Sequence, residues 1–309
     1  MKPKVIIIGG PTASGKTSLS VELAKRLNGE IISADSMQIY KKLDVGTAKV
    51  TEEEMQGIPH HLIDITEPNH EFSVAEFQNL AYQKIEEILA KGKQPIIVGG
   101  TGLYISSLVN NMKFVEYSEK EEEIKEKLKV RIEDLGENAK NVLYAELEEI
   151  DKDAAVKIPK NNFKRVVRAL EMYYITGKTK TQQEKLTIPE EGKYEYHTFI
   201  IDWPRNILYD RIEQRIDIMM NQNILEEAKW ILSLNLDNKC TAMQAIGYKE
   251  FFPYLKGEAT LEECVEVLKL NTRHYAKRQL TWFKRINNVK YIDANIKIEE
   301  KIEYIIKNI

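Results

Sequence analysis

Residues 10–17 have the residue types and the spacing of a phosphate-binding loop. Glycine at positions 10 and 15 permits turns in which consecutive backbone N–H groups point at one anion. The last two residues add a lysine charge and a hydroxyl that can bind a Mg²⁺ ion bridging phosphate oxygens. We therefore predict a diphosphate or nucleotide site made of Gly10, Pro11, Thr12, Ala13, Ser14, Gly15, Lys16 and Thr17, with Thr17 as the metal ligand.

Two further polar residues follow apolar runs that are typical of buried strands. Asp35 follows residues 30–33, and Thr101 follows residues 95–98 through a glycine turn. In an open parallel sheet the carboxyl ends of the strands line the ligand crevice, so both side chains are expected beside the phosphate loop. A phosphate loop, a carboxylate and a hydroxyl that converge in this way predict a reactive site. Asp35 could instead cap a helix, and its position alone does not decide between the two roles.

Strand and helix patterns alternate along most of the chain, as expected for a parallel sheet with crossover helices. We predict an α/β fold in which a P-loop NTPase-like parallel sheet is flanked by helices. Residues 115–194 carry charge-rich helical patterns and no strand pattern, so they are expected to form a helical insertion domain. The core domain then comprises residues 1–114 and 195–309. The predicted strands are residues 5–8, 30–33, 95–98 and 196–202, and the predicted helices include residues 16–27 and 72–89.

Arg211 and Arg215 lie four positions apart, which places both guanidinium groups on one face of a helix. Two such groups can bind the oxygens of a diphosphate bidentately. They could equally pair with Asp210, Glu213 or another carboxylate, and the sequence leaves both alternatives open. The histidines at positions 60 and 61 point to opposite faces of an extended segment, so they are expected to have a structural role and not to share a metal ion.

Composition restricts the class of protein. The net charge is −3, but residues 267–292 contain seven Lys or Arg and no Asp or Glu. Aromatic residues are interleaved with these bases in residues 272–285, a combination typical of a nucleic-acid contact surface. Two cysteines are too few for a disulfide framework, and the sequence contains neither a signal peptide pattern nor a membrane-spanning run. We expect a cytoplasmic protein.

Taken together, these motifs resemble the tRNA dimethylallyltransferase family, also called the IPP transferase family. The blocks containing Asp35, the paired histidines and Thr101 make the resemblance specific, whereas a phosphate loop alone would not. The likeness covers nearly the whole chain in the family's order, although residues 159–162 read Pro-Lys-Asn-Asn where family members usually read His-Pro-Asn-Asp. The matching segments are residues 10–17, 32–40, 46–49, 57–64, 98–104, 165–171, 245–250 and 272–283.

The resemblance implies transfer of a dimethylallyl group from dimethylallyl diphosphate to N6 of adenosine 37, just 3′ of the anticodon, in tRNAs that read codons beginning with U. It implies that Asp35 accepts the N6 proton, that Thr101 helps to hold the reacting groups, and that Lys16, Mg²⁺, Arg211 and Arg215 bind the leaving diphosphate. The tRNA contacts that it implies are Asp35, Ser36, Met37, Gln38, Thr101, Pro159, Lys160, Asn161, Asn162, Phe163, Arg165, Ala242, Ala245, Ile246, Gly247, Tyr275, Lys277, Arg278, Gln279, Thr281 and Trp282.

Two other functions are compatible with the phosphate loop. A small-molecule kinase would need an adenine-nucleotide site and a lid of arginines, for which the insertion could be mistaken. A non-catalytic tRNA-binding protein could use the loop as a switch. The expected protein is a monomeric enzyme that binds tRNA, dimethylallyl diphosphate and Mg²⁺.

Overall fold

The computed structural model describes residues 2–114, 121–186, 192–237 and 240–309. The chain divides into two compact units, the first formed by Met1–Asn111 and Gly192–Ile309, the second by Met112–Glu191. None of the described helices is both long enough and apolar enough to cross a membrane.

The first unit is built on a six-stranded parallel sheet with the strand order β3-β2-β4-β1-β5-β6. The predicted α/β class is therefore confirmed. In the register of the central strands Ile8 of β1 lies beside Val98 of β4 and Phe199 of β5. The strands are β1 (Lys4–Gly9), β2 (Gly29–Ser33), β3 (His60–His61), β4 (Gln94–Gly99), β5 (Glu195–Asp202) and β6 (Val289–Asp293).

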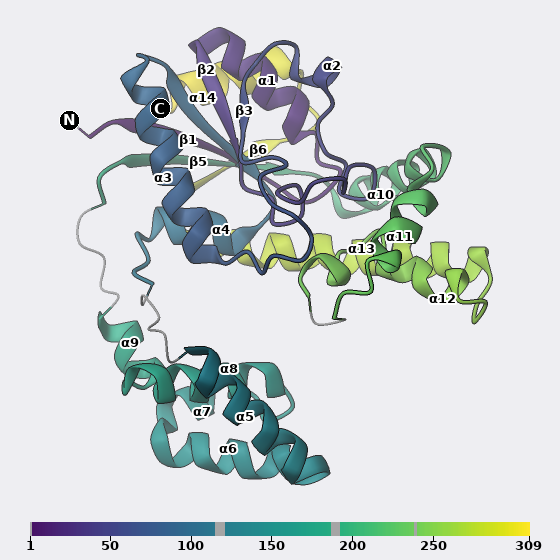
Figure 1. Ribbon diagram of the computed structural model, residues 1–309. Coiled ribbons are helices and arrows are strands. Elements are labelled where there is room, and N and C mark those ends of the chain that lie inside the picture. The colour runs from purple at the N-terminus through teal and green to yellow at the C-terminus, as the bar shows by residue number, and fades with distance from the viewer. Residues whose placement is uncertain (1, 115–120, 187–191, 238–239) are drawn as a thin grey trace. The chain divides into compact units, whose positions relative to one another are not determined.

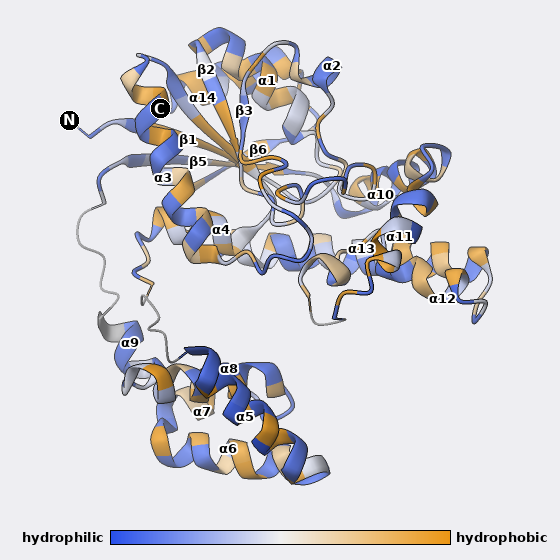
Figure 2. Ribbon diagram, in the orientation of Figure 1, coloured by the Kyte–Doolittle hydropathy of each residue, from blue (hydrophilic) through white to orange (hydrophobic). Residues whose placement is uncertain are grey.

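Helices cover both faces of the sheet (Figure 1). Alternate residues of β1 point to opposite faces, so that Ile6 and Ile8 pack towards α1 and α14, while Val5 and Ile7 pack towards α3 and α4. Strands buried on both faces need apolar residues at every position, and the strands are accordingly the most hydrophobic part of the sheet layer in Figure 2. These helices are α1 (Lys16–Leu27), α3 (Val74–Ala90), α4 (Gly102–Val109) and α14 (Ile298–Lys307).

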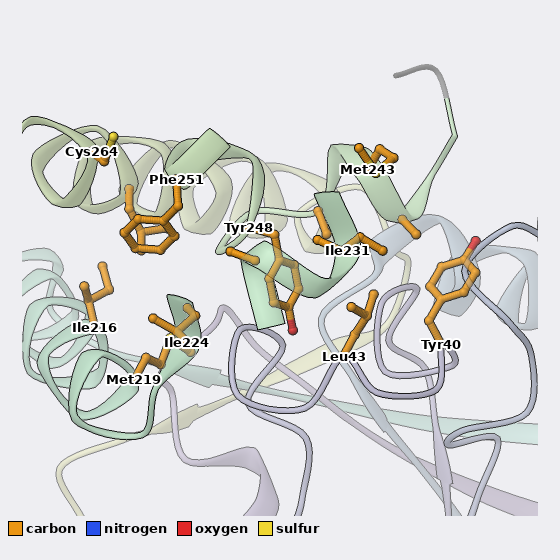
Figure 3. Close-up of a cluster of buried hydrophobic side chains, with 14 of the residues drawn as sticks. Tyr40, Leu43, Ile216, Met219, Ile224, Ile231, Met243, Tyr248, Phe251 and Cys264 are labelled. Atoms are coloured by element: carbon orange, nitrogen blue, oxygen red, sulfur yellow. The ribbon is translucent and has the colours of Figure 1, made fainter. Parts of the chain in front are cut away.

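A helical layer extends the first unit beside the carboxyl ends of the strands. Its core joins α10, α11 and α13 to the loop that follows β2, and Tyr248 and Phe251 are fully buried in it (Figure 3). The 23-residue helix α13 starts with a capping box at Thr260. The remaining helices of this unit are α2 (Glu52–Met55), α10 (Arg205–Asn221), α11 (Ile224–Ser233), α12 (Phe252–Leu255) and α13 (Leu261–Phe283).

The second unit contains helices and no described strand, and it has its own apolar core around Leu143, Leu147, Val166 and Leu170. The amphipathic helix over residues 163–176 ends at Gly177, which adopts the left-handed conformation that commonly terminates helices. The helices are α5 (Glu121–Leu135), α6 (Ala139–Ile150), α7 (Lys152–Lys157), α8 (Phe163–Thr176) and α9 (Lys180–Leu186).

The paired histidines form β3 at the edge of the sheet. His61 Nε2 lies 2.8 Å from a carboxylate oxygen of the buried Glu30, and His60 Nδ1 lies 2.8 Å from the carbonyl oxygen of Ile58. These two hydrogen bonds agree with the structural role that was expected for the pair.

Elements of the sheet layer that were not identified from the sequence include α4, β6 and α14. Strand β6 lies at the edge, and of its five residues only Ile292 is buried. It therefore lacks the continuous apolar run by which the central strands were recognised.

Candidate functional site

The phosphate-binding loop connects β1 to α1 at the carboxyl edge of the sheet. Lys16 is the first residue of α1, and its Nζ donates hydrogen bonds to the carbonyl oxygens of Gly10 (3.0 Å) and Pro11 (2.8 Å). Burial lowers the pKa of Lys16 to about 8, with a further lowering by the charge of Arg215 that Asp35 opposes. A half-buried cation at the positive end of a helix is prepared to receive an anion.

Both predicted arginines contact this loop. Arg211 Nε donates a 2.8 Å hydrogen bond to the carbonyl oxygen of Ala13, and Arg215 donates through Nη1 to Thr12 Oγ1 at 3.1 Å. The alternative pairing with Glu213 is wrong, because Glu213 binds Arg273 at 2.7 Å. The structure thus brings three cations, one lysine and two arginines, around the phosphate loop.

Asp35 and Thr101 lie at the ends of two neighbouring strands, β2 and β4. Thr101 Oγ1 accepts a 3.0 Å hydrogen bond from the backbone N–H of Ser36. The charge of Asp35 opposes the effect of burial on the pKa values of both Lys16 and Arg215, which places the carboxylate in the same electrostatic environment as the phosphate loop. Asp35 and Thr101 therefore lie at the same carboxyl edge of the sheet as the phosphate loop, and we refer to this edge as the crevice.

Asp35 does not cap a helix, because residues 36–39 form turns, but its side chain has a local role in that turn. Its Oδ1 accepts hydrogen bonds from the backbone N–H groups of Met37 (2.9 Å) and Gln38 (3.4 Å), which fixes the turn after β2. Both bonds use Oδ1. The same carboxylate can hold the turn with this oxygen and present Oδ2 to a ligand, so the two roles are compatible.

Gln279 of α13 ties the two halves of the crevice together. Its Oε1 accepts a 2.9 Å hydrogen bond from the backbone N–H of Thr12, and its Nε2 donates a 2.9 Å bond to the carbonyl oxygen of Gly100. A Cβ atom at position 100 would lie 2.1 Å from Nε2, so only glycine permits this approach. Gln279 is buried, and both ends of its amide are engaged within the protein.

Tyr275 lies one turn before Gln279 on the same helix. Burial and the charge of Asp35 raise the pKa of the Tyr275 phenol, while interactions with Thr101 and Gln279 oppose the shift. The phenol is therefore neutral at physiological pH.

The exposed side of α13 carries the basic residues that were predicted to contact tRNA. Lys277, Arg278 and Thr281 are exposed, and the Arg278 guanidinium lies over the ring of Tyr275, with its carbon 5.7 Å from the ring centre. Trp282 is half-buried, and a Cβ atom at position 102 would lie 2.5 Å from its Cβ. The basic face therefore begins directly beside the crevice.

Other predicted contacts occupy two separate places. Ala242, Ala245 and Gly247 are buried in the helical layer of the first unit, and Ile246 is half-buried there. The remaining predicted contacts lie in the second unit, where Pro159, Lys160 and Asn161 are exposed, Asn162 and Phe163 are half-buried and Arg165 is exposed at the start of α8.

Trp203 was missed by sequence reasoning. Its indole N–H donates a 3.0 Å hydrogen bond to the carbonyl oxygen of Ser14, and the Arg211 guanidinium stacks on its ring at 4.7 Å. Trp203 directly follows β5, so the strand-end rule that identified Asp35 and Thr101 could have found it.

The loop has features that suit a diphosphate and its metal. Ser14 Oγ is buried without a hydrogen-bond partner among the described residues, and a Cβ atom at position 15 would lie 3.8 Å from Arg211 Nη2. Thr17 follows Lys16 at the first turn of α1. A hydroxyl at this place fits a Mg²⁺ ion that takes its other ligands from phosphate oxygens and water.

Comparison with known proteins extends this picture. The chain matches the family model described as IPP transferase over residues 38–286. A tRNA dimethylallyltransferase of Thermoanaerobacter sp. (strain X514) is 49% identical over 99% of this chain and 98% of its own length. That of Halalkalibacterium halodurans is 45% identical over 98% and 95%.

Solved structures agree. A full-length tRNA isopentenylpyrophosphate transferase from Bacillus halodurans aligns with a TM-score of 0.72 and 44% identity, covering 98% of this chain and 94% of its own. A eukaryotic dimethylallyltransferase, solved while acting on tRNA, aligns with a TM-score of 0.77 and 33% identity, covering 94% and 74%. The family model and these full-length relatives show that this chain belongs to the IPP transferase family.

Proposed function

We propose that this protein transfers a dimethylallyl group from dimethylallyl diphosphate to N6 of adenosine 37 of tRNA, in tRNAs that read codons beginning with U, and releases diphosphate. The observation that carries the proposal is the crevice in which Lys16, Arg211 and Arg215 surround a phosphate loop while Asp35 and Thr101 face it from two strand ends. The leaving diphosphate needs cationic groups and the attacking amine needs a proton acceptor, and the two must lie on opposite sides of the allylic carbon.

The leaving group is bound by the phosphate loop. As the allylic C–O bond breaks, negative charge grows on the diphosphate, and the charges of Lys16, Arg211 and Arg215 stabilise it. The Ser14 hydroxyl, which has no described partner, can donate to a phosphate oxygen. A Mg²⁺ ion held by Thr17 and by the diphosphate would neutralise further charge.

The attacking nitrogen approaches from the side of Asp35. When N6 forms its bond to the allylic carbon it becomes cationic and must lose one proton. Oδ1 of Asp35 is held by the backbone amides of Met37 and Gln38, so Oδ2 is the oxygen that accepts this proton. The Thr101 hydroxyl, fixed by the amide of Ser36, orients the same side of the crevice.

The adenosine must leave its base stack to reach this crevice, which requires contacts to the RNA on both sides of it. We propose that the exposed bases Lys277 and Arg278 bind tRNA phosphates and that residues 159–165 of the second unit add contacts elsewhere on the anticodon stem-loop. We further propose a monomeric cytoplasmic enzyme, in keeping with the free, buried thiols of Cys240 and Cys264.

The direct test offers dimethylallyl diphosphate and unmodified tRNA to the purified protein in the presence of Mg²⁺ and the absence of ATP. We expect prenylated adenosine in nuclease digests analysed by mass spectrometry. Asp35→Asn should lower kcat by a factor of about 10² to 10⁴ while tRNA binding is retained. Asp210→Asn, which changes an exposed carboxylate of α10, is the matched control and should retain activity.

Each contrary result has a definite meaning. A product that forms only when ATP is added to this mixture would identify a kinase, and tRNA binding without any product would identify a binding protein. Full activity of Asp35→Asn would remove this carboxylate from the reaction.

A further inference from the structure

A carboxylate outside the crevice, that of Glu227 on α11, binds the loop that follows β2. Its oxygens accept hydrogen bonds from the backbone N–H groups of three successive residues, with shortest distances of 3.2 Å for Asp44, 2.9 Å for Val45 and 3.2 Å for Gly46. Three consecutive N–H groups that converge on one anion form a concave binding site of the type called a nest. Here the protein's own side chain fills that site.

A fourth donor completes the arrangement. The hydroxyl of the fully buried Tyr248 donates a 2.7 Å hydrogen bond to Glu227 Oε2. Tyr248 belongs to the buried cluster around Leu43 and Ile231 shown in Figure 3. A Cβ atom at position 46 would lie 2.5 Å from the Tyr248 ring, so the loop reaches the ring and the carboxylate only because residue 46 is glycine.

The next residue of this loop faces the phosphate site. The carbonyl oxygen of Thr47 accepts a hydrogen bond from Arg215 Nη2 at 3.5 Å, while Nη1 of the same guanidinium donates to Thr12 Oγ1 at 3.1 Å. The Thr47 and Ala48 carbonyl oxygens also accept from Gln38 Nε2, at 3.4 and 3.2 Å. The Arg215 guanidinium therefore contacts both this loop and the phosphate loop.

We propose that Glu227 is a positioning residue for diphosphate binding: it holds the loop at residues 44–47, and through the Thr47 carbonyl it fixes the guanidinium of Arg215 against the phosphate loop. The inference rests on the proposed function of that loop. Glu227 itself touches no substrate. The charge-assisted bonds to its carboxylate make the loop rigid, and a planar guanidinium binds phosphate oxygens best when its orientation is set in advance.

Calorimetric titration of the full-length protein with inorganic diphosphate and Mg²⁺ tests the inference without any turnover. Glu227→Gln keeps the size of the side chain but removes the charge, and the dissociation constant should rise about tenfold. Glu226→Gln, which changes the exposed neighbouring carboxylate, should leave it within twofold. In the transfer reaction Glu227→Gln should raise KM for dimethylallyl diphosphate more than it lowers kcat.

A second background separates positioning from general loss of structure. In Arg215→Lys the guanidinium is absent, so adding Glu227→Gln should have little further effect on diphosphate binding. An equal tenfold loss in both backgrounds would overturn the inference, as would unchanged binding in the single variant. If Glu227→Gln does not fold, Tyr248→Phe takes its place. It removes one donor to the carboxylate but keeps the carboxylate itself, and it should weaken diphosphate binding about threefold. Unchanged diphosphate binding by Tyr248→Phe would then overturn the inference.

The proposed function and this inference fail in different ways. If the unaltered protein binds no diphosphate, the phosphate site itself is wrong. If it binds diphosphate and Glu227→Gln binds equally well, only the role of Glu227 is wrong.

Discussion

The backbone amide of Thr12 donates a 2.9 Å hydrogen bond to the side chain of Gln279, which lies 267 positions later in the chain. The same side chain donates to the carbonyl oxygen of Gly100, so one amide group joins the phosphate loop to the loop after β4. Lys277 and Arg278 stand on the exposed side of the same helix. The surface proposed to bind tRNA is thus joined by one side chain to the site proposed to bind diphosphate.

Loss of this bridge should weaken both the fold and the site. Gln279→Met has a similar volume but can neither accept from Thr12 nor donate to Gly100, and unpaired buried groups of this kind cost about 1–3 kcal/mol. We expect a lower free energy of unfolding and a raised KM for dimethylallyl diphosphate. Gln222→Met, which changes an exposed glutamine, is the control for both measurements and should resemble the unaltered protein. Normal KM in Gln279→Met would show that the bridge is dispensable for the site.

The pKa of Lys16 gives diphosphate binding a defined pH dependence. Because burial lowers this pKa to about 8 in the free protein, the lysine is charged below pH 8 and neutral above it. A bound anion favours the charged form of Lys16. Above pH 8 the lysine must therefore take up a proton when diphosphate binds, and the affinity for diphosphate should fall up to tenfold per pH unit there. Titration calorimetry with dimethylallyl diphosphate from pH 7 to 10 measures the slope.

Lys16→Arg is the control for that slope. Its guanidinium does not titrate in this range, so the variant reports only the titration of the ligand itself. The same slope in both proteins would mean that Lys16 is not the group that takes up the proton.

The exposed bases of α13 should determine the salt dependence of tRNA binding. If Lys277 and Arg278 each neutralise one phosphate, the double variant Lys277→Ala with Arg278→Ala loses two phosphate contacts. The slope of log K against log salt should then become less steep by roughly two. Filter binding or fluorescence anisotropy between low and physiological salt gives this slope. Lys25→Ala on α1, where the lysine pairs with Glu22, is a comparison on the opposite face of the sheet. An unchanged slope in the double variant would place the tRNA elsewhere.

Glu30 should make the fold sensitive to acid. Burial alone would raise the pKa of its carboxyl, but hydrogen bonds from Lys93, His61 and Lys91 outweigh burial and lower the pKa to about 2. The unfolded value is near 4.3, so the stabilisation is present above that pH and is lost as the pH falls towards 2. Glu30→Gln should lower the free energy of unfolding at pH 7 by about 2 kcal/mol. Lys91 is half exposed, so solvent screens its interaction with Glu30 and reduces this value.

Chemical denaturation at pH 7 and at pH 3 measures this effect. The two proteins should differ less at pH 3, because Glu30 is then protonated in the unfolded state. Glu22→Gln, which breaks an exposed pair with Lys25, should cost less than 1 kcal/mol at either pH. A constant difference between Glu30→Gln and the unaltered protein at both pH values would contradict the assignment.

The amino-acid sequence by itself determined the fold class, the phosphate loop and the strand ends that carry Asp35 and Thr101. These features depend on local order, because a continuous apolar run predicts a buried strand and a glycine-lysine spacing predicts a phosphate loop wherever they occur. Strand topology then brings the strand ends together, so Asp35 could be assigned to the crevice without coordinates. Strand β6 was not predicted, because an edge strand buries too few residues to show a continuous apolar run.

The tertiary structure alone decided which groups face one another across long stretches of sequence. Spacing placed Arg211 and Arg215 on one helix face, but only the packing of α10 against the phosphate loop chose that loop over Glu213 as their partner. Likewise, the bonds of Gln279 to Thr12 and of Glu227 to the loop after β2 join segments more than 180 positions apart. Such contacts depend on how helices pack, which no local pattern specifies.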